Sequence, residues 1–145
     1  MSQKKIIVAL DSDNLKSTVS LVKILKNDAY AFKIGYEFFF NFGIDGYKYI
    51  QKENVKIFLD LKLHDIPNTV RGGINAISKL NPYFTTIHIS GGDQMQKAAV
   101  SAKKNTKILG VSILTSLDSS QTKKYNYNDN IEKIVADYTN YALNN

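Results

Sequence analysis

The chain has 145 residues, 43% of them apolar, which is the length and composition of one soluble globular domain. It contains no cysteine, which excludes disulfides, thiolate nucleophiles and cysteine-ligated metal centres. The apolar run near the amino terminus, Ile6–Leu10, is too short for a signal-peptide core or a membrane span. We therefore expect a cytoplasmic protein that does not bind membranes.

The formal net charge of +6 raises the question of nucleic acid binding. The basic residues are eighteen Lys and a single Arg, Arg71, and no basic run is longer than two residues. Arg supplies the bidentate base and phosphate contacts on which specific nucleic-acid binders depend. The pattern therefore predicts no nucleic acid partner and only a mild attraction for anionic small molecules.

Five apolar, β-branched runs recur at intervals of roughly 25 to 30 residues, a spacing typical of β-strands separated by helices. These runs are Ile6–Leu10, Tyr30–Ile34, Val55–Leu61, Phe84–Ile89 and Ile108–Leu114. Because the runs are continuous rather than alternating, they predict a parallel sheet that is covered on both faces.

Helical patterns separate and follow these runs. They cover residues 15–25, 36–50, 67–80, 95–102 and 131–143. Asn14 or Ser17 can cap the first helix, and Gly43 and Gly46 are expected to interrupt the second. Pro67 stands where the third helix begins, with a fixed φ that suits the first helical turn.

Regular βα alternation is typical of either an open doubly wound sheet or a (β/α)8 barrel, and the missing glycine fingerprint after the first strand favours the barrel. A full barrel takes about 250 residues, so this chain corresponds to about five of the eight units. We therefore expect an α/β fold of the (β/α)8 TIM-barrel type, here a partial barrel. It would form a single domain over residues 1–145, with units six to eight absent.

Charged side chains gather at the carboxyl ends of the predicted strands, where barrel folds keep their chemistry. Asp11 follows the first strand, Lys33 lies in the second, and Asp60, Lys62 and Asp65 end the third. The two-residue period of a strand predicts that Asp60 and Lys62 share one face. Since an unpaired internal charge costs roughly several kcal/mol, the alternating signs predict one mutually neutralising network. A solvated barrel rim with ordinary ion pairs is the alternative.

Other polar residues near the strand ends are open to two interpretations. His64 and His88 are interpreted as structural hydrogen-bonding groups, because no further ligand lies at a metal-binding spacing, and no metal site is predicted. Asn68-Thr69, Ser90–Gly92 and Thr115-Ser116 either bind a ligand or only form turns.

The ten residues Asp60-Leu61-Lys62-Leu63-His64-Asp65-Ile66-Pro67-Asn68-Thr69 resemble the signature of the orotidine 5′-phosphate decarboxylase family. Supporting segments follow the family's order and, together with the signature, span almost the whole chain: Val8–Asp11, Lys33–Gly35, His88–Gly92 and Leu114–Ser116. Related decarboxylases and aldolases share only the Asp-x-Lys-x-x-Asp core and usually carry Glu where this sequence has Lys33. The lysine and the His-Asp-Ile-Pro-Asn-Thr continuation therefore favour the pyrimidine enzyme.

The resemblance implies cofactor-free decarboxylation of orotidine 5′-monophosphate to uridine 5′-monophosphate and CO2 in de novo pyrimidine biosynthesis. Lys62 would stabilise the carbanion at C6 and deliver the proton, while Asp60 would lie against the substrate carboxylate. Lys33 and Asp11 would hold the ribose hydroxyls. Thr115 would lie near the pyrimidine.

The resemblance also implies a homodimer with active sites at the interface, in which Asp65, Ile66 and Thr69 reach into the partner's site. The family's phosphate-binding Arg and Gln belong to later barrel units, whose absence is expected to weaken turnover. A second hypothesis is therefore an inactive remnant or a partner-dependent fragment of the same enzyme. A third is a related sugar-phosphate decarboxylase.

Overall fold

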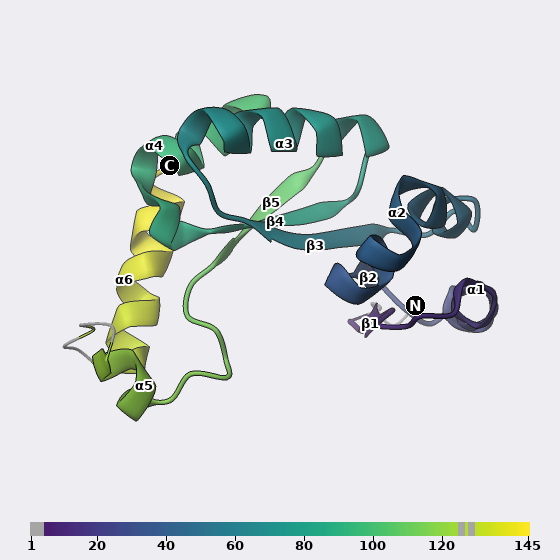
Figure 1. Ribbon diagram of the computed structural model, residues 1–145, viewed down its shortest axis with the longest axis horizontal. Helices are drawn as coiled ribbons and strands as arrows, with labels where there is room; N and C mark the ends of the chain where they lie inside the picture. Colours follow the sequence, from purple (N-terminus) through teal and green to yellow (C-terminus); the bar gives the residue numbers. More distant parts are fainter. Residues whose placement is uncertain (1–4, 125–126, 128–129) are drawn as a thin grey trace. The chain divides into compact units, whose positions relative to one another are not determined.

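The computed structural model describes residues 5–124, 127 and 130–145 (Figure 1). Five strands alternate with helices and form one sheet in chain order, β1-β2-β3-β4-β5. The β1/β2 and β2/β3 pairs are parallel, with Val8 opposite Phe32 and Lys33 opposite Phe58. The chain is thus an α/β protein with the partial TIM-barrel architecture that the strand spacing predicts.

Each strand overlaps one of the predicted apolar runs, although the third extends two residues past the predicted end at Leu61. The strands are β1 (Ile7–Ala9), β2 (Ala31–Ile34), β3 (Ile57–Leu63), β4 (Phe84–His88) and β5 (Lys107–Val111). The prediction that the fifth strand continues to Leu114 is wrong, because the chain turns there and the Leu117 N–H donates to the Leu114 carbonyl at 3.0 Å. The fourth strand ends one residue early, because Ile89 begins the 3-10 turn η1 (Ile89–Gly91).

The predicted helices are confirmed and one further helix is present. The helices are α1 (Leu15–Leu25), α2 (Tyr36–Gln51), α3 (Pro67–Leu80), α4 (Gly92–Ala102), α5 (Ser119–Lys124) and α6 (Ile131–Leu143). The short helix α5 has no apolar periodicity from which it could be predicted. It depends on a local cap, since the Asp118 carboxylate accepts the N–H groups of Ser120 and Gln121 at 2.9 Å each.

Two local features of the first helices decide points that the sequence leaves open. Asn14 is the N-cap of α1, and its side-chain oxygen accepts the Ser17 N–H at 3.0 Å. Gly43 interrupts α2 with φ 56° and ψ −148°, a backbone conformation that is essentially restricted to glycine. The predicted interruption of the second helix therefore lies at Gly43, whereas Gly46 keeps helical geometry.

The described residues pack into two compact units, and each is described by itself. The first comprises residues 5–61, 81–85 and 105–107. Its core is built from side chains of α1, α2, β2 and β3 that are at most 1% exposed: Val22, Ala31, Phe32, Ile34, Phe38, Tyr47, Ile50 and Leu59. Burying each large apolar side chain contributes about 1.5–3 kcal/mol, which fixes β2 and β3 against these helices, and β1 pairs with β2.

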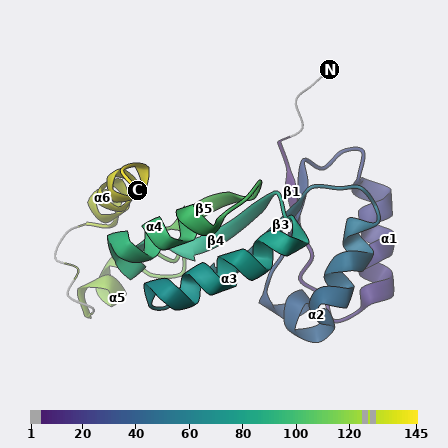
Figure 2. The ribbon, with the colours of Figure 1, turned by 90° about the horizontal axis from the view of Figure 1, so that it is seen from above.

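The second unit comprises the described residues of 62–80, 86–104 and 108–145. Helices α3 and α4 lie side by side in it (Figure 2). Its core contains Val70, Ile74, Ile87, Met95, Ala99 and Ala102, with Leu63 and Ile108 packed against them. Within the described part of the chain, no helix is long and apolar enough to cross a membrane.

Candidate active site

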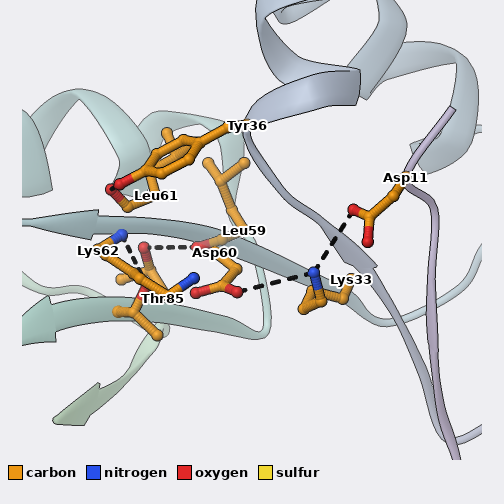
Figure 3. Close-up of polar contacts among 9 residues, drawn as sticks. Asp11, Lys33, Tyr36, Leu59, Asp60, Leu61, Lys62 and Thr85 are labelled. Carbon is orange, nitrogen blue, oxygen red and sulfur yellow. Dashed lines mark hydrogen bonds and ion pairs between the residues drawn. The ribbon is translucent and has the colours of Figure 1, made fainter. Parts of the chain in front are cut away.

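Three charged side chains meet at the carboxyl ends of β1, β2 and β3. The Lys33 ammonium lies 3.6 Å from Asp11 Oδ1 and 3.8 Å from Asp60 Oδ2, between the two carboxylates (Figure 3). Neighbouring parallel strands end at the same edge of a sheet, so residues far apart in sequence come together there. We call Asp11, Lys33 and Asp60 the carboxyl-end cluster.

Burial is graded across the carboxyl-end cluster. The Asp60 side chain is 9% exposed, that of Lys33 is 25% exposed and that of Asp11 is 52% exposed. The attraction between charges grows where water is excluded, so the Lys33–Asp60 pair is held more firmly than the pair with Asp11. The outer members can therefore exchange hydrogen bonds with a polar ligand while Asp60 stays fixed.

A glycine provides the space that this cluster occupies. A Cβ at Gly35, the N-cap of α2, would lie 3.2 Å from Asp11 Oδ1 and 3.3 Å from Lys33 Nζ. The helix therefore begins directly beside the two charged groups. Residue patterns alone assign Gly35 no role, because spatial crowding leaves no mark in a linear sequence.

The second unit begins with Lys62, two residues after Asp60 in β3. Its backbone has φ 46°, and its N–H donates to the Thr86 hydroxyl at 2.8 Å. Regular strand geometry, on which the predicted shared face depends, is therefore interrupted at Lys62. Leu59 and Asp60 are both buried, so each face of β3 is covered at that point.

Two buried hydroxyls on β4 are not among the site residues predicted from the sequence. Thr85 and Thr86 are 0% and 4% exposed, and the Thr85 hydroxyl donates to the Leu59 carbonyl at 2.9 Å. A recognisable signal existed, since two adjacent threonines interrupt an otherwise apolar run.

The remaining predicted site residues lie on the surface of the second unit. Asp65 is exposed, and its Oδ1 accepts the Ile66 N–H at 2.7 Å. Ile66 is 66% exposed, and Thr69 is exposed in the first turn of α3. Thr115 is exposed in the turn that follows β5. The predicted substrate and partner contacts of these four residues stay predictions.

Two histidines of the second unit lie close to one another. The rings of His64 and His88 have centroids 5.0 Å apart. Burial lowers the pKa of His88 below its usual value near 6.5, and the positive charges of His64 and Lys62 lower it further. The described residues contain no group of three or more His, Asp or Glu side chains that could hold a metal ion.

A second polar cluster lies at the opposite, amino-terminal ends of the strands in the first unit. Tyr83 accepts hydrogen bonds from Lys107 Nζ and from the Tyr30 hydroxyl, both at 3.0 Å. Lys56 Nζ lies 4.1 Å from the ring centroid of Tyr30 and 4.6 Å from that of Tyr83. The hydrogen bonds lower the pKa of Tyr83 to about 8. We call Tyr30, Lys56, Tyr83 and Lys107 the amino-end cluster.

A βα sheet whose strands lie in chain order, with charged groups at their carboxyl ends, is typical of the TIM-barrel class, because doubly wound sheets reverse their strand order. Comparison with protein families narrows this class. Residues 4–144 match the family described as Orotidine 5'-phosphate decarboxylase / HUMPS family, and the chain belongs to this family.

Individual relatives agree with this assignment. The chain is 42% identical over 131 residues to orotidine 5'-phosphate decarboxylase of Ehrlichia chaffeensis, covering 89% of this chain and 57% of that protein. It is 46% identical over 116 residues to the enzyme of that name from a Wolbachia of Brugia malayi, covering 79% of this chain and 52% of that protein. The crystal structure of orotidine 5'-phosphate decarboxylase from Lactobacillus acidophilus superposes with a TM-score of 0.81 at 38% identity. The match covers 97% of this chain and 67% of that protein. The chain thus spans little more than half the length of these two curated relatives.

Proposed function

We propose that the chain contributes the catalytic centre for decarboxylation of orotidine 5′-monophosphate to uridine 5′-monophosphate and CO2, a step of de novo pyrimidine biosynthesis. The observation that carries this proposal is the Lys33 ammonium held between the carboxylates of Asp11 and Asp60, in a chain of this family. The relatives named above bear the name of this enzyme. The related sugar-phosphate decarboxylases usually carry Glu at the position of Lys33, so the lysine favours the pyrimidine substrate.

In the proposed reaction, the bond from C6 to the carboxylate breaks and its electron pair stays on C6. Asp60, buried and negative, lies against the substrate carboxylate, so that repulsion is relieved as neutral CO2 leaves. The ammonium of Lys62 stabilises the carbanion and then transfers a proton to C6. The neutral amine recovers a proton from solvent, and the cycle needs no cofactor.

The outer members of the carboxyl-end cluster bind the ribose in this proposal. Asp11 accepts hydrogen bonds from the sugar hydroxyls, and Lys33 donates to them. Their partial exposure supports this role, because a ligand can reach them without unfolding the strand ends. Thr115 contacts the pyrimidine from the turn after β5.

We further propose that the active form is a cytoplasmic homodimer in which Asp65, Ile66 and Thr69 enter the partner's site. The exposed Ile66 supports this arrangement, since a large apolar side chain beside a charged strand end gains stability when a partner covers it. Within each subunit, residues 1–145 act as one partial barrel domain.

The test is the loss of orotidine 5′-monophosphate absorbance in the ultraviolet. The purified chain is assayed alone and together with the carboxyl-terminal part of a full-length relative, with Lys62→Ala as the control in both cases. We expect turnover that Lys62→Ala lowers by at least about a hundredfold, since it removes both the cation and the proton donor.

The two arms separate the possible outcomes. Activity of the chain by itself would make it sufficient for catalysis, and activity only with the added part would identify a partner-dependent enzyme. Turnover that survives Lys62→Ala would reject the assigned role of Lys62. Absence of turnover in both arms would favour the inactive remnant.

A further inference from the structure

The backbone of Lys62 adopts a conformation that its residue type rarely takes. Among the described non-glycine residues, three have positive φ: Asn54, Lys62 and Asn81. Asparagine tolerates the left-handed region, and both asparagines follow the end of a helix. Lys62 is neither an asparagine nor in a turn, because β3 continues to Leu63.

A buried hydroxyl receives the N–H that this conformation redirects. In a regular parallel ladder that N–H would donate to a carbonyl of the neighbouring strand. Here it donates to Thr86 Oγ1 at 2.8 Å, and Thr86 is 4% exposed. A sparsely populated backbone conformation persists only where its surroundings hold it, and this hydrogen bond is a contact that does so.

The direction in which a side chain leaves the backbone depends on φ and ψ, so whatever fixes the Lys62 backbone also aims its ammonium. We infer that Thr86 is a positioning residue whose hydroxyl holds Lys62 in the left-handed conformation and thereby places its ammonium for proton transfer to C6. The catalytic part of this inference rests on the proposed function. The conformational part does not.

The neighbouring residue on β4 offers a matched control. Thr85 has the same side chain and is 0% exposed, and its hydroxyl also bonds to the backbone of β3. It donates to the carbonyl of Leu59, whose φ is not positive. Thr85→Val and Thr86→Val therefore remove equivalent buried hydroxyls, and only the second removes the acceptor for Lys62.

The first measurement concerns the Lys62 amide and requires no substrate. Nuclear magnetic resonance of the full chain gives its hydrogen-exchange rate and the amide-to-Hα coupling, which reports φ. We expect Thr86→Val to raise the exchange rate at least about tenfold and to change the coupling. Thr86→Ser should retain wild-type values, as should Thr85→Val. An unchanged Lys62 amide in Thr86→Val overturns the inference, and Thr86→Ala replaces that variant if it does not fold.

The second measurement is turnover in the two-arm assay above. We expect kcat to fall about ten- to a hundredfold in Thr86→Val, because small displacements of a reacting group are costly, with little change in KM. Thr86→Ser should recover kcat, and Thr85→Val should leave it near wild type. An equal loss in Thr85→Val would mean that Thr86 acts only through stability. If the wild type shows no turnover, the proposed function fails, and the Lys62 amide still decides the conformational part.

Discussion

The two ends of the same strands hold lysines in opposite ways. In the carboxyl-end cluster, the Lys33 ammonium lies between two carboxylates at 3.6 and 3.8 Å, one of them buried. In the amino-end cluster, Lys56 lies over phenol rings and Lys107 donates to a phenol oxygen. The first arrangement leaves full charges partly exposed beside one another, whereas the second places exposed ammonium groups against aromatic rings.

This difference agrees with the division of labour within TIM barrels, where the carboxyl-terminal face carries chemistry and the opposite face carries stability. The presence of a lysine at a strand end therefore does not indicate by itself whether that end binds a ligand or stabilises the fold. Its partners decide whether it serves a ligand or the fold, and variants at the two ends should separate these effects.

The largest contrast is expected between Lys33→Met and Lys107→Met. Lys33→Met removes the ammonium that faces the buried Asp60 carboxylate, so we expect a loss of about 2 kcal/mol in the free energy of unfolding. We also expect turnover to fall by at least about a hundredfold. Lys107→Met should leave turnover unchanged. Urea unfolding and the ultraviolet assay measure the two quantities, and equal effects on turnover at both ends would remove the contrast.

A smaller effect is expected from Gly35→Ala, which adds one methyl group beside the carboxyl-end cluster. The new Cβ would meet Asp11 Oδ1 and Lys33 Nζ, the ends of side chains that can shift by a few tenths of an ångström. We expect stability to change by less than about 1 kcal/mol while turnover falls about tenfold. A drop in stability without a drop in turnover would show that the cluster tolerates the displacement.

The pH dependence of stability should report His88, at the carboxyl end of β4. Because its pKa is lowered in the folded chain, the unfolded chain binds the proton more readily. The contribution of His88 to the free energy of unfolding is therefore present at neutral pH and is lost as the pH falls below about 6.5. We expect His88→Gln to flatten the slope of unfolding free energy between pH 7 and pH 5, and His64→Gln to reduce it. A slope that both variants leave unaltered would contradict this assignment.

The smallest effect is expected at Tyr83 in the amino-end cluster. Its pKa of about 8 means that the phenolate forms well before that of an ordinary tyrosine. The folded state therefore gains stability as the pH rises from about 8 towards 10, where unfolded tyrosine still holds its proton. Ultraviolet difference titration, with Tyr83→Phe subtracted, should show this early transition. Lys107→Met should move this transition to higher pH. A transition at the same pH in the wild type and in Lys107→Met would exclude the Lys107 hydrogen bond as the cause.

Most of the fold could be predicted from the sequence, because long apolar runs and helix-boundary residues act locally. Pro67 and Asn14 mark helix starts through the geometry of their own backbone or side chain. The end of β5 and the presence of α5 could not be predicted, since both depend on hydrogen bonds within a polar segment. The residue composition of a polar segment does not show which of its side chains will form such hydrogen bonds.

The carboxyl-end cluster was predicted in part. The strand order brings Asp11, Lys33 and Asp60 together, and their ion pairs confirm that charged groups meet at this edge. The left-handed backbone of Lys62 was not predicted, because a regular two-residue period assumes extended geometry throughout β3. The space at Gly35 and the acceptor at Thr86 arise from tertiary proximity, which no local pattern records.

The break at Gly43 makes α2 two helices with separate rotational phases. The first half follows Lys33 and starts at Tyr36, whereas the second buries Tyr47 and Ile50 in the core. Because the helical hydrogen-bond ladder does not run unbroken through Gly43, a change in length or twist beyond it does not rotate the residues before it. Thermal motion or repacking around Tyr47 and Ile50 in the second half is thus absorbed at Gly43, while the residues beside Lys33 keep their orientation.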